Sequence, residues 1–303
     1  MYSLKMYNGV EIPAIILGPG GPARAKGLPF IADTSIFSKA WRKFVTGPIV
    51  IRKFVNAVGS GLTAGFRGLD FSASYGNAEW IADAMRKSGV KRKDVFLTGR
   101  ISNGIQFRGE RAVEELIKRL LDEYQTDYLD LLQFHWPVTG FFENTWKVIC
   151  KAYERGKARS IGVANCHRHH IEALMNVGLK PMVNQFEVHP LFTQKELIKY
   201  NQDIGIVVES YTPIARMDMR LYKFPALKKI ATRHGKSAVQ IVLRWHVQQS
   251  LVPVVRSTNH ERQMENLDIF DFELAPEEMR IIDGFNINSR LRFDPDNCDF
   301  TVL

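Results

Sequence analysis

The stretch VFLTGRISNGIQFRGERAVEELIKRLLDEYQTDYLDLLQF (residues 95–134) predicts a strand, a helix and a second strand, in that order. Its two ends, 95–101 and 128–134, are short apolar runs typical of buried strands. Between them, 108–124 repeats apolar residues at the i, i+3, i+4, i+7 spacing of a helix that buries one face. These residues are Val113, Leu116, Ile117, Leu120, Leu121 and Tyr124. The stretch therefore predicts one βαβ unit with parallel strands.

The same alternation continues along most of the 303 residues. Eight apolar runs predict strands, at about 14–17, 66–71, 95–101, 128–134, 158–163, 181–186, 206–211 and 251–255. Further helical patterns occur at 77–88, 142–155, 194–203 and 237–249. This order favours an α/β fold, a (β/α)₈ TIM barrel that forms a single domain over 1–303. A doubly wound open sheet is the rival, and it is weakened because no G-x-G-x-x-G turn follows the first strand.

Three segments fall outside the repeat. MYNGVEIP (residues 6–13) has Asn-Gly between short apolar stretches and predicts an N-terminal β-hairpin at the bottom of the barrel. Residues 18–47 form a long insertion, which would emerge at the catalytic mouth if the first strand ends near Leu17. The tail from about 285 to 303 has little periodicity, and we expect it to lie over the surface.

Composition narrows the class of protein. Hydrophobic residues make up 45% of the chain and charged residues 24%, which is typical of a soluble globular protein. The chain shows no apolar run of membrane-spanning length and no signal peptide, so no membrane partner is expected. Three cysteines without a CxxC pair favour the reducing cytoplasm. The net charge of +9 is spread along the chain without a basic arm, so no nucleic acid partner is expected.

Four polar residues stand near the C-terminal ends of predicted strands. They are Asp70, Tyr75, Arg100 and His135. Side chains at that end of an α/β barrel converge on one mouth, where catalysis occurs. There a phenol can give a proton, a cation can lower the phenol's pKa, a carboxylate can hold the cation, and an imidazole can orient a substrate. Each residue alone could be structural, but together they favour a proton-delivery group.

Longer motifs surround these residues and carry a family resemblance. They are GFRGLDFSASYGN (65–77), LLQFHWP (131–137), GKARSIGVAN (156–165), VNQFEVHP (183–190) and RSTNHERQMENLDIFDFEL (256–274). With these motifs in this order, the chain resembles an aldo-keto reductase over nearly its whole length, most closely the small bacterial and plant-type members. The resemblance implies NADPH-dependent reduction of a small-molecule carbonyl substrate by a monomer or weak dimer.

The resemblance also implies individual roles. Tyr75 would be the general acid, His135 would orient the substrate, Asp70 would support the cation Arg100, and Trp136 would line the substrate pocket. The implied cofactor-binding residues are Asn165 and Gln185 for the nicotinamide carboxamide, Tyr211 for the nicotinamide ring, Arg256, Ser257 and Arg262 for the 2′-phosphate, and Glu265 and Asn266 for adenine. Amide side chains suit a carboxamide, and planar guanidinium groups suit a phosphate. The segment NHERQMENL (259–267) predicts a short helix whose N-terminus favours an anion.

The chain departs from the family pattern near the predicted site. Arg100 stands where lysine is usual, Ala164 stands where serine is usual, and Gly18 is followed by Pro19 instead of threonine. Arginine stays protonated and cannot relay a proton. An alternative function is therefore an NADPH-binding redox sensor or regulatory protein of low turnover.

A third reading is a metal-dependent barrel hydrolase that uses the histidine run 167–170. Such an enzyme would need carboxylate ligands at strand ends, for which only Asp70 and Glu187 are plausible. No carboxylate lies near the histidine run in sequence, and a solvated helix start explains the run more simply. We therefore expect no metal.

Overall fold

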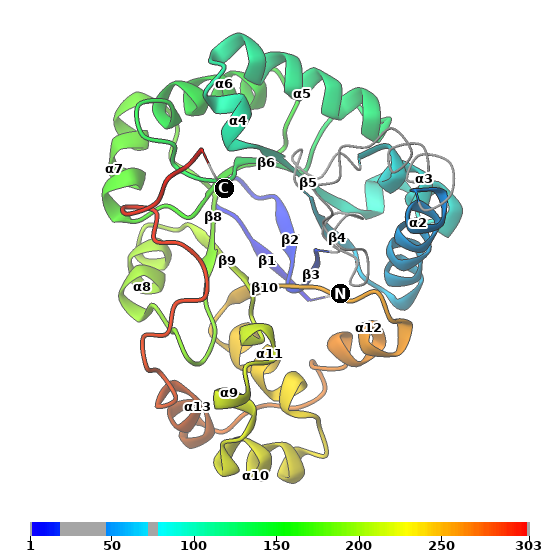
Figure 1. Cartoon of the computed structure of the whole chain (residues 1–303), viewed down its shortest axis with the longest axis vertical. Helices are drawn as coiled ribbons and strands as arrows, with labels where there is room; N and C mark the ends of the chain where they lie inside the picture. Colours follow the sequence, from blue (N-terminus) through cyan, green and yellow to red (C-terminus); the bar gives the residue numbers. More distant parts are fainter. Residues whose placement is uncertain (1, 19–46, 72–77, 302–303) are drawn as a thin grey trace, which may run out of the picture.

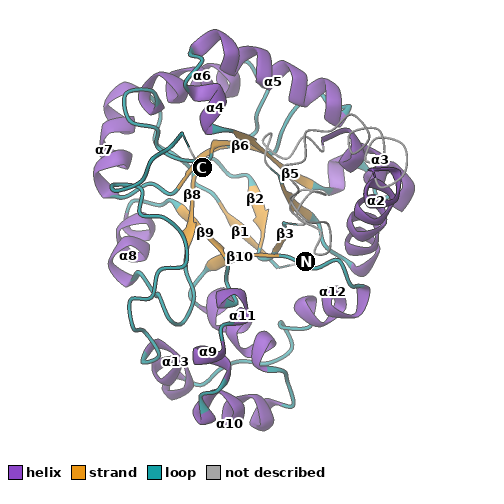
Figure 2. Ribbon diagram, in the orientation of Figure 1, coloured by secondary structure: helices purple, strands orange, loops and turns teal. Residues whose placement is uncertain are grey.

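The computed structural model describes residues 2–18, 47–71 and 78–301. Eight parallel strands form a closed barrel in the order β10-β3-β4-β5-β6-β7-β8-β9 (Figure 2). The strands are β3 (Ile16–Leu17), β4 (Gly68–Asp70), β5 (Phe96–Ile101), β6 (Leu131–Phe134), β7 (Ile161–Ala164), β8 (Val183–Glu187), β9 (Val207–Tyr211) and β10 (Leu251–Val255). All eight predicted strands are confirmed, with ends that shift by up to three residues.

Helices surround the barrel on its outside (Figure 1). The principal ones are α2 (Gly47–Ala64), α3 (Ala78–Ser88), α5 (Glu110–Tyr124), α6 (Phe142–Glu154), α7 (Arg168–Val177), α8 (Lys195–Asp203), α11 (Ala238–Gln248) and α12 (His260–Leu267). Smaller helices are α4 (Asn103–Gln106), η4 (Arg92–Asp94), η5 (Ala215–Met217), α9 (Met219–Tyr222), α10 (Pro225–His234) and α13 (Pro276–Asp283). The predicted (β/α)₈ barrel is therefore confirmed. In the described residues, no helix has both the length and the apolar character that a membrane span requires.

Helix α5 shows how local pattern and packing agree. The apolar residues predicted from its spacing are all buried against the barrel, while the opposite face carries charged pairs such as Arg111 and Glu115. Each large apolar side chain that leaves water contributes about 1.5–3 kcal/mol relative to an exposed one. The helix ends where Gln125 adopts a left-handed conformation with φ of 53°. These forces hold β5 and β6 side by side and so fix the position of Arg100.

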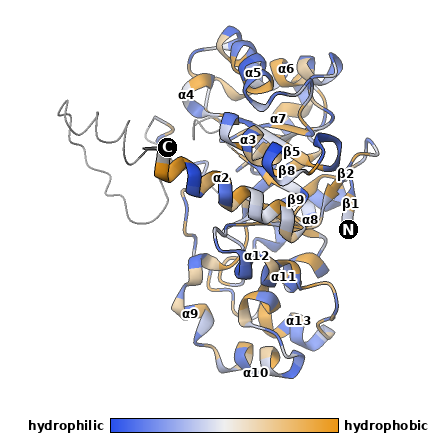
Figure 3. Cartoon of the chain, turned by 90° about the vertical axis from the view of Figure 1, so that its right-hand side faces the viewer, coloured by the Kyte–Doolittle hydropathy of each residue, from blue (hydrophilic) through white to orange (hydrophobic). Residues whose placement is uncertain are grey.

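The predicted N-terminal hairpin is also confirmed. Strands β1 (Ser3–Lys5) and β2 (Glu11–Pro13) pair antiparallel, and Gly9 in the turn has φ of 87°, which favours glycine. Only two residues separate Pro13 from β3, so the hairpin adjoins the N-terminal ends of the barrel strands. Figure 3 shows β1 and β2 at one end of the molecule and the end of the C-terminal tail at the other. The hairpin therefore lies at the opposite end of the barrel from the C-terminal ends of its strands.

The C-terminal tail lies at the mouth. From residue 284 to residue 301 it contains no helix or strand, and it runs from α13 past α8 to α7 (Figure 1). Glu187, at the end of β8, accepts hydrogen bonds from the backbone N–H groups of Leu291 (2.7 Å) and Arg292 (2.9 Å). The tail thus follows the surface as predicted. The 18–47 insertion lies outside the described residues, apart from its first and last positions.

Candidate active site

Two of the four predicted catalytic residues form a buried ion pair inside the barrel. Asp70 ends β4, and Arg100 lies on the neighbouring strand β5. Arg100 Nη2 lies 2.8 Å from Asp70 Oδ1 and 2.7 Å from Oδ2. The two side chains are 6% and 5% exposed. Because a single buried ion is costly, each of these charges needs the other.

Gln185, on β8, completes a network with this pair. Its Oε1 accepts a hydrogen bond from Arg100 Nη2 at 2.8 Å. Its Nε2 donates to Asp70 Oδ2 at 2.9 Å and to Glu209 Oε2 at 2.8 Å. Gln133, with its amide turned so that it donates to Val163 O, accepts from Arg100 Nη2 at 2.8 Å. Both amide protons of Gln185 are therefore already used within the barrel.

Glu209 is a member of this network that our sequence analysis missed. It lies on β9 with no exposed surface. Burial and the Asp70 carboxylate raise the pKa of Glu209 well above its usual range, against the lowering effects of Gln185 and Arg100. The folded protein therefore favours a proton on Glu209, which leaves one cation and one anion in the cluster. The available signal was a lone acid within the apolar run VVESY.

Glu209→Gln is expected to change how stability depends on pH. The folded-state pKa of Glu209 lies above its ordinary value of 4.5. The contribution of Glu209 to the free energy of unfolding is therefore present below pH 4.5, and it is lost as the pH rises toward the folded-state pKa. Urea unfolding of the parent should show this loss, at up to about 1.4 kcal/mol per pH unit, and the glutamine variant should not. Glu115→Gln, on the exposed face of α5, is the control, and parallel profiles for the parent and Glu209→Gln would contradict the assignment.

A second group of predicted residues meets at the same end of the barrel. Asn165 Nδ2 donates to the backbone oxygen of His135 at 2.9 Å, and Tyr211 donates its hydroxyl proton to Asn165 Oδ1 at 2.7 Å. Asn165 has φ of 59°, a left-handed conformation that asparagine tolerates better than most residues. These contacts join the ends of β6, β7 and β9. The His135 side chain is half-buried.

Trp136 lies against the C-terminal tail. Its ring is 2% exposed and its centroid is 6.4 Å from that of Phe300. Gln106 Nε2 donates to Trp136 O at 3.0 Å, and Asn103 Nδ2 donates to Phe300 O at 3.4 Å. Helix α4 therefore holds both sides of this contact. Trp136, the residue predicted to line a substrate pocket, is therefore buried against the tail.

The residues predicted for phosphate and adenine all lie in the segment that follows β10. Val254 pairs with Tyr211, so this segment leaves the barrel at the same rim. Ser257 and Asn266 are buried, Glu265 is half-buried, and Arg256 and Arg262 are exposed. The predicted short helix is confirmed as α12, whose first turn is capped by Asn259 Oδ1 accepting from Arg262 N at 2.9 Å.

Tyr75 lies outside the described residues, so its place beside Arg100 stays a prediction.

The histidine run opens α7, as predicted, with His167 at the N-cap. Its nearest carboxylate comes from the distant tail: His167 Nδ1 lies 2.7 Å from Asp296 Oδ2. The two carboxylates that a barrel hydrolase would need have other partners. Asp70 pairs with Arg100, and Glu187 binds the tail and accepts from His189 Nε2 at 2.9 Å. Among the described residues, the two carboxylates that the hydrolase reading relies on are therefore already engaged by other groups.

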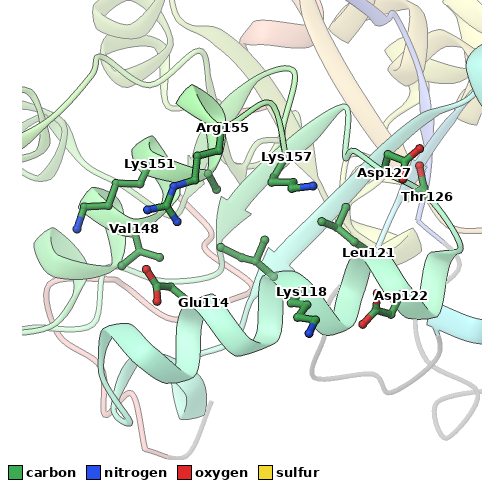
Figure 4. Close-up of a pocket in the computed structure, with 12 residues that line it drawn as sticks. Glu114, Lys118, Leu121, Asp122, Thr126, Asp127, Val148, Lys151, Arg155 and Lys157 are labelled. Atoms are coloured by element: carbon green, nitrogen blue, oxygen red, sulfur yellow. The ribbon is translucent and has the colours of Figure 1, made fainter.

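A surface pocket of about 430 Å³ lies between α5 and α6 (Figure 4). Helix α5 contributes Glu114 and Lys118, and α6 contributes Lys151. Thr126 and Lys157, which also line it, precede β6 and β7 and so belong to the N-terminal end of the barrel. This pocket is at the wrong end of the strands to serve the network around Arg100.

Comparisons with known proteins agree with this geometry. The sequence model of the aldo/keto reductase family matches residues 47–287. The chain is 39% identical over 299 residues to the glyoxal reductase of Bacillus subtilis (strain 168), covering 98% of each chain. It is 33% identical over 245 residues to the methylglyoxal reductase DkgA of Escherichia coli (strain K12), covering 80% of this chain and 86% of that one.

Solved structures show the same likeness. The crystal structure of a Bombyx mori aldo-keto reductase in complex with NADP superposes with a TM-score of 0.81 at 28% identity, covering 97% of this chain and 96% of that one. An aldo-keto reductase from a deep-sea metagenome library, MGS-M4, gives a TM-score of 0.85 at 30% identity, covering 98% and 100%. With its closed parallel barrel and the polar network at the ends of the strands, this chain belongs to the aldo/keto reductase family and is an oxidoreductase.

Proposed function

We propose that this protein is an NADPH-dependent oxidoreductase that reduces an aldehyde or ketone to an alcohol. The observation that carries the proposal is the buried Asp70–Arg100 pair, in which Asp70 holds the Arg100 guanidinium near the C-terminal end of β5. The relatives named for glyoxal and methylglyoxal reduction support small carbonyl compounds as the substrate class.

NADPH, when bound, supplies the hydride from nicotinamide C4 to the carbonyl carbon. Tyr75 gives its hydroxyl proton to the carbonyl oxygen as negative charge develops there. Arg100 favours the resulting tyrosinate, because an opposite charge nearby stabilises the ionised phenol. Asp70 holds the guanidinium in place, and the half-buried His135 orients the carbonyl group. The reaction is reversible, and the ratio of the two cofactor forms sets its direction.

The donor set at the rim fits such a cofactor with one difference. Exposed Arg256 and Arg262 near buried Ser257 suit a phosphate monoester, and the contact of Tyr211 with Asn165 at the same rim supports a nicotinamide site there. Gln185 already donates both amide protons to Asp70 and Glu209. A hydrogen bond from Gln185 to the carboxamide therefore requires the loss of one of these contacts.

Arg262→Ala is expected to weaken NADPH binding at least about tenfold and to leave NADH binding nearly unchanged. The extra phosphate gains charge-assisted hydrogen bonds worth about 1.5–3 kcal/mol each, which only NADPH can form. Fluorescence titration with each cofactor measures the effect. Arg111→Ala, which removes another exposed arginine, on α5, is the control. An equal loss for both cofactors would show that Arg262 does not bind the 2′-phosphate.

The full proposal is tested by NADPH oxidation over a panel of aldehydes and ketones that includes glyoxal and methylglyoxal. Steady consumption of NADPH that depends on the carbonyl supports the reductase. Tight NADPH binding without turnover on any member of the panel supports the alternative, an NADPH-binding redox sensor or regulatory protein of low turnover. The engagement of Gln185 by Arg100 and the two acids is the observation that favours this alternative.

A further inference from the structure

Three histidines and the C-terminal tail meet at the start of α7. His167 caps the helix, and His169 and His170 lie in its first turn. Asp296 reaches them from the tail, 126 residues after His170 in sequence. The His169 and Asp296 side chains are 62% and 39% exposed, while His170 is 10% exposed. His170 is thus packed into the protein, while His169 and Asp296 are open to solvent.

The spacing of three of these side chains suits a metal ion. Asp296 Oδ1 lies 3.3 Å from His169 Nε2 and 3.6 Å from His170 Nε2. One ligand atom from each of the three lies within 4.8 Å of the other two. Four ligands at about 2.0–2.1 Å from a tetrahedral Zn²⁺ ion stand about 3.3–3.4 Å from one another. The two separations from Asp296 Oδ1 are therefore close to two edges of such a tetrahedron, and the separation of the two histidine ligand atoms is within 4.8 Å.

We propose that His169, His170 and Asp296 bind a transition-metal ion of the Zn²⁺ type, with a solvent ligand in the fourth position. Two imidazoles and one carboxylate are ligands that zinc accepts, and this set has no resemblance to the all-oxygen cages that suit calcium. The ion would join the tail to α7. The metal site is independent of the proposed reductase function, because none of its ligands belongs to the network around Arg100.

The residues around the three ligands supply supporting contacts. His167 Nδ1 lies 2.7 Å from Asp296 Oδ2, a hydrogen-bond distance that orients the carboxylate for a metal on its other oxygen. His170 Nδ1 accepts from His167 N at 3.2 Å. When His170 Nε2 binds the metal, the ring proton lies on Nδ1, which then cannot accept a hydrogen bond. The contact from His167 N to Nδ1 is therefore lost, and the bond to the metal replaces it.

The position of the site gives it a structural consequence. Asn165 lies two residues before His167, and Phe300, which packs on Trp136, lies four residues after Asp296. An ion held by His169, His170 and Asp296 therefore fixes the tail segment that forms part of the predicted pocket wall. Metal occupancy would make this wall more rigid without any change at Arg100.

The direct test is calorimetric titration of the full-length, EDTA-treated and dialysed protein with Zn²⁺. The parent should bind one ion per chain. His169→Ala and Asp296→Asn should each weaken binding at least about tenfold, because the loss of an outer-shell group alone typically costs that much and these residues are direct ligands. Asp299→Asn removes the same charge from the tail outside the cluster and should bind as the parent does. Equal affinity in the parent and His169→Ala would overturn the site.

A second readout follows the tail itself. Trypsin cleavage after Arg290 or Arg292, followed by intact mass, reports how firmly the tail is held. Zn²⁺ should slow this cleavage severalfold in the parent and in Asp299→Asn, and should have no effect in His169→Ala. Because His169 is mostly exposed, its alanine variant is expected to fold. Equal cleavage of the parent with and without Zn²⁺ would show that no ion joins the tail to α7.

Discussion

Tyr75→Phe is expected to lower carbonyl turnover by about 10²–10⁴-fold, the usual contribution of a general acid. The change removes the hydroxyl proton and keeps the ring, so NADPH affinity should stay at the parent value. In the proposed mechanism, the Arg100 guanidinium, held by Asp70, supplies the positive charge that favours the ionised phenol. NADPH oxidation at saturating carbonyl measures turnover, and fluorescence titration measures cofactor binding.

Tyr153→Phe, on helix α6 outside the barrel, is the matched control and should reduce carbonyls as the parent does. A Tyr75→Phe variant with the parent rate would show that Tyr75 is structural and that the proton comes from elsewhere. A variant that also loses NADPH would assign the residue to cofactor binding instead.

Arg100→Met is expected to lower the free energy of unfolding by about 3–5 kcal/mol, because it leaves the buried Asp70 carboxylate without its cation. The same change takes the donor away from Gln185 Oε1. Urea unfolding measures the loss. Arg111→Met breaks an exposed pair with Glu115 on α5 and should cost much less. If the two methionine variants lose the same free energy of unfolding, burial of the Asp70–Arg100 pair does not increase its contribution to stability. In the fraction of the protein that stays folded, Arg100→Met should also lower carbonyl turnover below the parent rate.

Arg100→Lys keeps the charge and changes the shape of the group. We expect it to raise the reduction rate without tightening NADPH binding. Lysine is usual in the family at this position, and the planar guanidinium of arginine is bulkier than the compact ammonium of lysine. Arg100 Nη2 also engages Gln185, and a displacement of about 1 Å at such a site can cost on the order of 10²-fold in rate. A lysine variant slower than the parent would show that the site is built around arginine.

Most of the barrel could be predicted from local pattern, but α2 could not. Its sequence, GPIVIRKFVNAVGSGLTA, combines β-branched residues with glycines, which have weak helix propensity. The structure gives the reason for one glycine: a Cβ on Gly61 would lie 2.4 Å from Leu17 Cδ2 of strand β3. Contacts of α2 with α3 and α12 support the helix where its own sequence does not.

The sequence by itself determined the alternation of strands and helices, and with it the rim on which Asp70, Arg100 and Gln185 stand. These features depend on residues a few positions apart, whose periodicity the chain carries in every window. Only the tertiary structure decided the partners: Arg100 and Gln185 are 85 residues apart, and Gln185 and Asp70 are 115 apart. Closure of the barrel sets Glu209 beside them, and the path of the tail sets Asp296 against His167. Such contacts depend on which elements become neighbours, and that is settled by packing of the whole chain.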